Sequence, residues 1–208
     1  MSIFPDTHVI HYNKFKSEIE NRLSDFKNVK PESYFYELCY CICTPQSKAV
    51  HANRVVQVLQ ERQFFEIGFN PEETLRDGSH YIRFHSQKAL SLLKARENWH
   101  EIQLMITDTA TDIKQKRDSL AKHVRGLGMK EASHFLRNIG MFGVAIIDRH
   151  VLKHLVLCGV FCEMPRLISK KDYLTIERQW FDYCYEIGIA QEIVDLLFWS
   201  YETGHVLK

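Results

Sequence analysis

The sequence has no long hydrophobic run, no leader-like amino terminus and almost no net charge. Its longest apolar runs, such as residues 144–147 and 151–160, are far shorter than the roughly 20 residues of a membrane-spanning helix. The opening segment MSIFPDTHVIHYNK lacks a basic stretch followed by an apolar one, so nothing in it predicts secretion. The formal net charge is +1, which by itself points to no charged partner. We therefore expect a cytoplasmic protein.

The six cysteines lack the spacing of a metal site, because no C-x-x-C pair occurs. The three within residues 39–43 alternate, and on a helix such neighbours point about 200° apart. Cys158 and Cys162 lie four residues apart, and we interpret them as small buried apolar residues in a reducing compartment. His150 and His154 have the same spacing and fit a pair on a helix surface better than a metal site. The sequence predicts no metal and no cofactor.

The sequence also lacks the pattern of a β-sheet. No segment alternates apolar and polar residues for long enough, and no Asn-Gly or Asp-Gly turn joins two β-branched runs. Apolar residues recur instead at helical spacing, as in Phe15, Ile19, Leu23 and Phe26. We predict an all-α protein in which residues 28–142 form one helical lobe. The chain ends, residues 1–27 and 143–208, are expected to form a second, with a cleft between the two.

A glycine-containing break interrupts the helical pattern at Gly126-Leu127-Gly128. Six basic and two acidic side chains lie in residues 111–130, a local excess of positive charge that suits a phosphate backbone. A G-x-G turn lets backbone N–H groups converge on one phosphate, and the next helix adds the positive end of its dipole. A tight corner between two helices would use the same glycines, so the turn alone leaves both interpretations open.

Lys130 and Asp148 add chemistry to this turn. Lys130 falls on the first turn of the helix after the glycines, where the helix dipole disfavours the charged ammonium and favours a nucleophilic amine. Such an amine could attack the anomeric carbon of a deoxyribose and displace the base. Asp148 follows the apolar residues 144–147 and fits a helix N-cap, from which a carboxylate can stabilise positive charge on the sugar. A phosphate contact by the lysine and simple capping by the aspartate are the alternatives.

The run VRGLGMKEA at residues 124–132, with Gly140 and IIDRHV at 146–151, resembles the helix-hairpin-helix and aspartate signature of base-excision DNA glycosylases. Within that superfamily the chain is most similar to the type-2, archaeal-type 8-oxoguanine DNA glycosylase/AP lyases, and the likeness spans nearly the whole chain. It also rests on TPQSKA at 44–49, the segment from Arg83-Phe84 to Lys88-Ala89, Phe198-Trp199 and a terminal Lys208. Many members have proline in the hairpin, which is absent here, and the four-cysteine cluster motif of other relatives is also absent.

The resemblance implies a role for particular residues. It makes Lys130 the nucleophile and Asp148 its partner. It implies DNA contacts by Gln46, Arg125, Gly126 and Gly128, and base recognition by Phe84, Trp199 and Lys208. We expect a monomeric, nucleoid-associated bifunctional enzyme that flips 8-oxoguanine out of damaged double-stranded DNA, releases it through a lysine imine and cleaves the strand by β-elimination. The alternatives are a monofunctional glycosylase that uses activated water, and a hairpin protein that binds DNA without chemistry.

Overall fold

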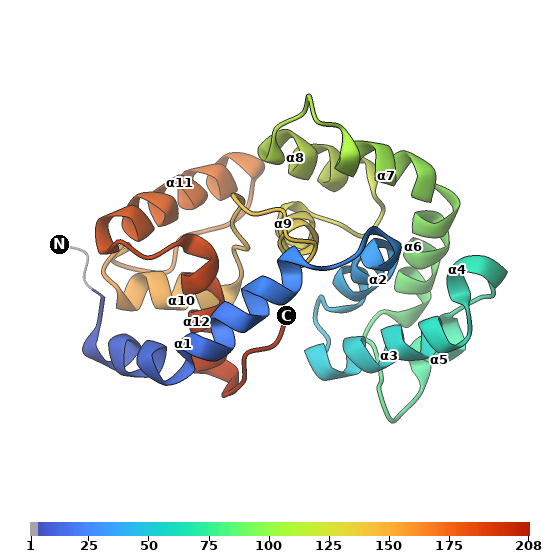
Figure 1. Cartoon of the computed structure of the whole chain (residues 1–208), viewed down its shortest axis with the longest axis horizontal. Coiled ribbons are helices and arrows are strands. Elements are labelled where there is room, and N and C mark those ends of the chain that lie inside the picture. Colours follow the sequence, from blue (N-terminus) through green and yellow to red (C-terminus); the bar gives the residue numbers. More distant parts are fainter. Residues whose placement is uncertain (1–3) are drawn as a thin grey trace. The chain divides into compact units, whose positions relative to one another are not determined.

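The computed structural model describes residues 4–208, and every regular element within them is a helix (Figure 1). The predicted all-α class is therefore confirmed. The chain forms two compact units. Unit 1 contains the chain up to Asn28 together with Gly140–Lys208, and unit 2 contains Val29–Ile139.

Unit 2 is built around α2, Tyr34–Cys43, whose sequence is apolar on all sides. Seven of its ten residues are buried, as expected for a helix with neighbours on every face. It packs against α3, α6 and α9. In chain order the unit holds η1 Pro31–Ser33, α2, α3 Ala49–Glu61, α4 Phe64–Ile67, α5 Glu72–Arg76, α6 His85–Glu97, α7 Trp99–Thr107, α8 Ile113–His123 and α9 Met129–Asn138.

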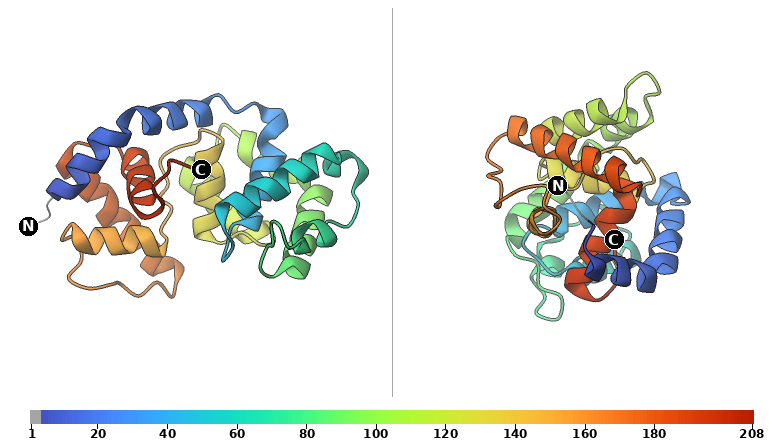
Figure 2. Two further views of the ribbon diagram at one scale, coloured as in Figure 1. Left: turned by 90° about the horizontal axis from the view of Figure 1, so that it is seen from below. Right: turned by 90° about the vertical axis from the view of Figure 1, so that its left-hand side faces the viewer.

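Unit 1 holds α1 Asp6–Lys27, α10 Arg149–Leu157, α11 Lys170–Ile187 and α12 Gln191–Thr203. The amphipathic α1 lies along α12, which also packs against α10 and α11 (Figure 2). The buried face of α1 contributes Phe15, Ile19 and Phe26 to a core that includes two leucines of α12. Both ends of the chain thus build one core, because the apolar stripe of α1 needs a partner helix from the carboxy-terminal segment.

Two helix ends of unit 1 fall where the sequence places capping residues. The hydroxyl of Ser169 accepts a hydrogen bond from the backbone of Asp172 and begins α11, and Gly204 ends α12 with a φ of +76°. The interpretation of Cys162 as buried is wrong, because α10 ends at Leu157 and Cys162 lies exposed in the turn beyond it. Residues four positions apart, such as Cys158 and Cys162, lie on the same face only if one continuous helix contains both.

Two general properties concern the described part of the chain. None of its helices combines the length and the apolar character that crossing a bilayer requires. Across residues 4–208, histidine, cysteine, aspartate and glutamate side chains nowhere gather in threes at metal-binding distance.

Candidate active site

The hairpin of unit 2 consists of α8, the turn at residues 124–128 and α9. Gly126 has a φ of +91°, a region that favours glycine. A Cβ there would lie 3.0 Å from Ser91 Oγ, so a side chain at this position would also crowd α6. Arg125 is exposed beside it and donates to Gln87 Oε1 at 2.9 Å. The predicted turn between two helices is confirmed, with α6 as its support.

Gly128 begins α9 and has an ordinary backbone conformation, with a φ of −98°. Its N–H donates to Glu131 Oε2 at 3.3 Å, so a side chain three residues ahead closes the first turn. A Cβ at Gly128 would meet only that same carboxylate oxygen, at 3.2 Å. The fold therefore does not demand glycine here, although close approach of a phosphate to the backbone would.

Lys130 lies on the first turn of α9, as predicted. Its side chain is 26% exposed, and Nζ is 3.5 Å from Glu131 Oε1. Glu131 thus links two features at the start of α9, the N–H of Gly128 and the ammonium of Lys130. The amine is accessible to a ligand and is held near the hairpin turn by a short helix that is otherwise largely buried.

Lys88 is a feature of this unit that the sequence reasoning did not single out as functional. It is only 8% exposed, and its Nζ donates to Cys43 O at 2.8 Å, to Pro45 O at 2.6 Å and to Ser47 Oγ at 3.3 Å. Burial, followed by smaller effects that include the nearby charge of Lys130, lowers the pKa of Lys88 to about 8. Its position on the face of α6 that also buries Leu92 and Ala95, four and seven residues on, is the sequence signal of its burial.

Gln46 and Phe84, the two other candidates in unit 2, share an unusual backbone conformation. Both are left-handed, with φ of +56° for Gln46 and +58° for Phe84. Gln46 is exposed in the loop between α2 and α3, and Phe84 is 53% exposed directly before α6. Left-handed residues other than glycine are uncommon and concentrate at functional sites.

Asp148 caps α10 in unit 1. Its Oδ1 accepts hydrogen bonds from the backbone nitrogens of His150 and Val151, both at 2.9 Å, and the side chain is partly exposed. The preceding residues 144–147 are buried, and α11 holds them through the carboxylate of Glu177 and the hydroxyl of Tyr173. The predicted N-cap is confirmed, and the apolar run before it is a non-helical segment that hydrogen bonds to α11 hold in place.

Trp199 and Lys208 lie at the carboxy-terminal end of unit 1. Trp199 is partly buried on α12, and the chain turns back after Gly204. Val206 is buried in the same core as Phe15 of α1, and Lys208 is partly buried. The tail is therefore packed on unit 1 and does not project as a frayed end.

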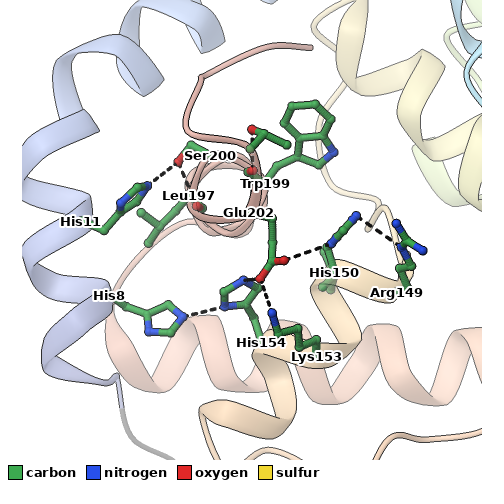
Figure 3. A network of polar contacts seen from close by, with 12 residues as sticks. His8, His11, Arg149, His150, Lys153, His154, Leu197, Trp199, Ser200 and Glu202 are labelled. Atoms are coloured by element: carbon green, nitrogen blue, oxygen red, sulfur yellow. Dashed lines mark hydrogen bonds and ion pairs between the residues drawn. The ribbon is translucent and has the colours of Figure 1, made fainter. Parts of the chain in front are cut away.

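A polar network joins three helices of unit 1 (Figure 3). His154 Nδ1 lies 2.7 Å from His8 Nε2, and His154 Nε2 lies 3.1 Å from Glu202 Oε1. Glu202 Oε1 also accepts a hydrogen bond from Lys153 Nζ. Burial, with a further effect of His8, lowers the pKa of His154 to about 4. The interpretation of His150 and His154 as a surface pair is wrong for His154, which is fully buried because α1 and α12 cover that face of α10. The network ties the helix that Asp148 caps to the helix that carries Trp199.

The structure thus distributes the predicted residues over both units. Arg125, Gly126, Gly128 and Lys130 gather at the hairpin, with Gln46 and Phe84 on loops of the same unit. Asp148, Trp199 and Lys208 belong to the other unit. Each unit supplies one group suited to sugar chemistry, the amine from unit 2 and the carboxylate from unit 1.

The sequence and the fold are similar to those of known proteins. Residues 19–189 match a family model described as 8-oxoguanine DNA glycosylase. An 8-oxoguanine DNA glycosylase/AP lyase from Fusobacterium nucleatum is 36% identical over 95% of this chain and 94% of its own, and one from Methanocaldococcus jannaschii is 34% identical over 94% of each. The crystal structure of a Methanocaldococcus jannaschii 8-oxoguanine glycosylase/lyase in complex with 15mer DNA containing 8-oxoguanine superposes with a TM-score of 0.83 at 31% identity, covering 96% of this chain and 99% of that one. With its all-helical fold, its hairpin lysine and its capping aspartate, the chain belongs to the 8-oxoguanine DNA glycosylase family.

Proposed function

We propose that this chain excises 8-oxoguanine from double-stranded DNA and then cleaves the strand at the resulting abasic site. The observation that carries the proposal is the position of Lys130, a partly exposed amine on the first turn of α9 directly behind the glycine turn. The names of the relatives, which combine glycosylase and AP lyase, support the same two activities. A purely DNA-binding hairpin has no use for this amine together with Asp148.

The hairpin supplies the grip on the DNA backbone in this proposal. The exposed turn at Gly126 and Gly128 offers backbone N–H groups to a phosphate, and Arg125 adds a positive charge beside it. The carboxylate of Glu131 occupies the N–H of Gly128 in the structure, so a phosphate would replace it there. Such contacts carry no base information, and we therefore assign them to positioning on the duplex.

Access to the damaged base requires flipping, since the reacting atoms are hidden in the stack. Gln46 is exposed and has a left-handed backbone conformation, and we propose that its side chain fills the space that the base leaves in the duplex. Phe84 and Trp199 offer aromatic surfaces for the extruded base. Lys208 supplies a side-chain ammonium, whose donors can hydrogen-bond the oxygen that 8-oxoguanine has and guanine lacks.

The reaction then proceeds through the amine. Lys130 Nζ attacks C1′ of the sugar, and the electron pair of the glycosidic bond leaves with the base, which takes up a proton. The nitrogen gives up one proton, and the ring oxygen leaves C1′ and takes up a proton to become a hydroxyl, which gives a protonated imine. Loss of a C2′ proton breaks the C3′–O bond and cleaves the strand, and water finally releases the lysine. The Asp148 carboxylate stabilises the positive charge that develops on the sugar and accepts a proton from the amine.

The same set of side chains requires no metal or cofactor, and a single chain supplies both the amine and the carboxylate. We therefore propose a monomer that acts on chromosomal DNA at the nucleoid.

Excision and strand cleavage are tested with a duplex that contains one 8-oxoguanine and a matched duplex with guanine. Release of the base and a nick without alkali treatment support the proposal. A nick only after alkali would indicate the monofunctional enzyme, and neither product would indicate a binding protein.

A further inference from the structure

Lys88 forms hydrogen bonds to the residues on both sides of Gln46 and so holds the loop that carries it. Its ammonium donates to the carbonyl oxygen of Pro45 on one side of Gln46 and to the hydroxyl of Ser47 on the other, besides the carbonyl of Cys43 at the end of α2. A buried ammonium is tolerated only where hydrogen bonds replace its water, and here the three acceptors come from the last residue of α2 and the loop that follows it. The loop and the lysine therefore stabilise one another.

The same residue is bonded to Phe84. The backbone nitrogen of Lys88 donates to Phe84 O at 3.0 Å in the first turn of α6. Ser47 adds a second link, because its hydroxyl also accepts from the backbone nitrogen of Arg83 at 3.0 Å. Lys88 and Ser47 thus join two chain segments, each with a left-handed residue that is not glycine. Such conformations are strained and persist only where neighbouring contacts impose them.

We propose that Lys88 is a positioning residue, which fixes Gln46 and Phe84 relative to one another so that filling the gap in the duplex and capturing the extruded base are coupled. This inference rests on the proposed function for the roles of Gln46 and Phe84. Lys88 itself need not touch the DNA, because its ammonium is buried and used by the loop. Its effect falls on base extrusion and capture and leaves the chemistry at Lys130 intact.

Electrostatic action on Lys130 is the competing role for this ammonium. The charges of Lys130 and Glu131 both affect the pKa of Lys88, so these groups interact. Two substrates separate the two roles. Excision of 8-oxoguanine needs extrusion and capture as well as the amine, whereas imine formation at a pre-formed abasic site needs the amine and has no base to capture.

The test compares Lys88→Met, which keeps the length of the side chain and removes its donors, with Lys94→Met. Lys94 lies on the same helix, its side chain is 59% exposed, and it pairs only locally with Glu97. We expect Lys88→Met to slow single-turnover excision at least tenfold, in keeping with the cost of misplacing a binding group by about 1 Å. Imine trapping by Lys88→Met at an abasic site should stay within about threefold of that by the original chain. Lys94→Met should behave like the original chain on both substrates.

The coupling to Gln46 is tested by a double-mutant cycle. If Lys88 acts through the loop, Lys88→Met should cost much less in a Gln46→Ala background than in the original chain. Equal loss on both substrates, full additivity with Gln46→Ala, or no loss of excision would overturn the proposal. Should Lys88→Met fail to fold, Ser47→Ala removes the shared acceptor while the lysine keeps two carbonyls. The same split between substrates is expected, and unchanged excision would overturn the proposal.

Amide hydrogen exchange provides a readout that does not depend on activity. In the protein without DNA, Lys88→Met should speed exchange in residues 44–47 and 83–88, and Lys94→Met should not. Unchanged exchange in both segments would contradict the positioning role. If the original chain lacked both activities while exchange responded as expected, the proposed function would be wrong and the structural link would stand.

Discussion

The carboxylate of Asp148 accepts a hydrogen bond from the backbone nitrogen of Val151 at 2.9 Å and so closes the first turn of α10. The residue proposed to stabilise the reacting sugar is therefore also a structural cap. Removing it altogether would confuse the two roles, but asparagine separates them because its side-chain oxygen caps a helix about as well as that of aspartate.

Asp148→Asn should keep the melting temperature and the DNA affinity and reduce excision by on the order of a hundredfold or more, because the variant retains the cap and loses the charge. Asp148→Ala should in addition lower stability by about 1 kcal/mol. Thermal denaturation and single-turnover excision measure the two effects. Near-normal excision by Asp148→Asn would remove the carboxylate from the mechanism.

Gly126 and Gly128 should respond differently to alanine. At Gly126 the new Cβ would face both a φ of +91° and Ser91 Oγ at 3.0 Å, so we expect destabilisation by about 1–3 kcal/mol. At Gly128 the backbone is ordinary and only the mobile end of Glu131 must shift, so the melting temperature should change little. Gly128→Ala should nevertheless weaken binding to duplex DNA in a fluorescence anisotropy titration. A stable Gly126→Ala variant would show that the turn can relax.

Deleting Lys208 should reduce release of 8-oxoguanine much more than strand cleavage at a pre-formed abasic site, which requires Lys130 but no base pocket. The packing of Val206 on unit 1 holds the tail, so loss of the last residue should leave the melting temperature almost unchanged. A recognition group that is left unpaired by the wrong base costs roughly 1–3 kcal/mol, equivalent to about five- to 150-fold in rate. Equal losses on the two substrates would exclude a role in recognition.

The pH dependence of stability should depend on His154. The folded protein keeps this side chain neutral down to about pH 4, whereas the unfolded chain protonates it near the ordinary value of 6.5. The unfolded state therefore binds more protons between these values, and the free energy of unfolding falls as the pH falls from about 6.5 to 4. His8, whose pKa burial also lowers, acts in the same direction, and Glu202 and Lys153 are the charged groups facing His154.

His154→Gln should make the melting temperature less sensitive to pH in this window, by a few degrees between pH 7 and 4.5. His123→Gln, which changes an exposed histidine of unit 2, provides the control and should keep the original pH profile. Calorimetric scans at several pH values measure both. An unchanged slope in His154→Gln would mean that the network does not hold this histidine neutral.

Local sequence signals predicted much of the fold and several positions in the site. The turn at Gly126, the start of α9 before Lys130 and the cap at Asp148 depend on a few adjacent residues, and these predictions are confirmed. The family was also correctly identified from the hairpin and aspartate motifs. The catalytic and recognition roles of the individual residues stay predictions.

Features that depend on tertiary packing were missed. The burial of Lys88 requires the end of α2 and the loop after it to supply three oxygen atoms, and these lie more than forty positions earlier in the sequence. The burial of His154 requires α1 and α12 to meet over α10. The short α4 was not predicted, because four residues carry too little periodicity to reveal a helix.

Borohydride trapping tests the central claim most directly. The protein is incubated with a duplex containing a single 8-oxoguanine in the presence of borohydride, and the covalent adduct is located by peptide mass spectrometry. We expect the original chain to form one adduct, on Lys130, and Lys130→Gln to form none and release no base while its DNA affinity stays within a few-fold, because the amine acts covalently and is only one of several positive charges. An adduct of normal yield in Lys130→Gln, or normal base release by that variant, would contradict the account.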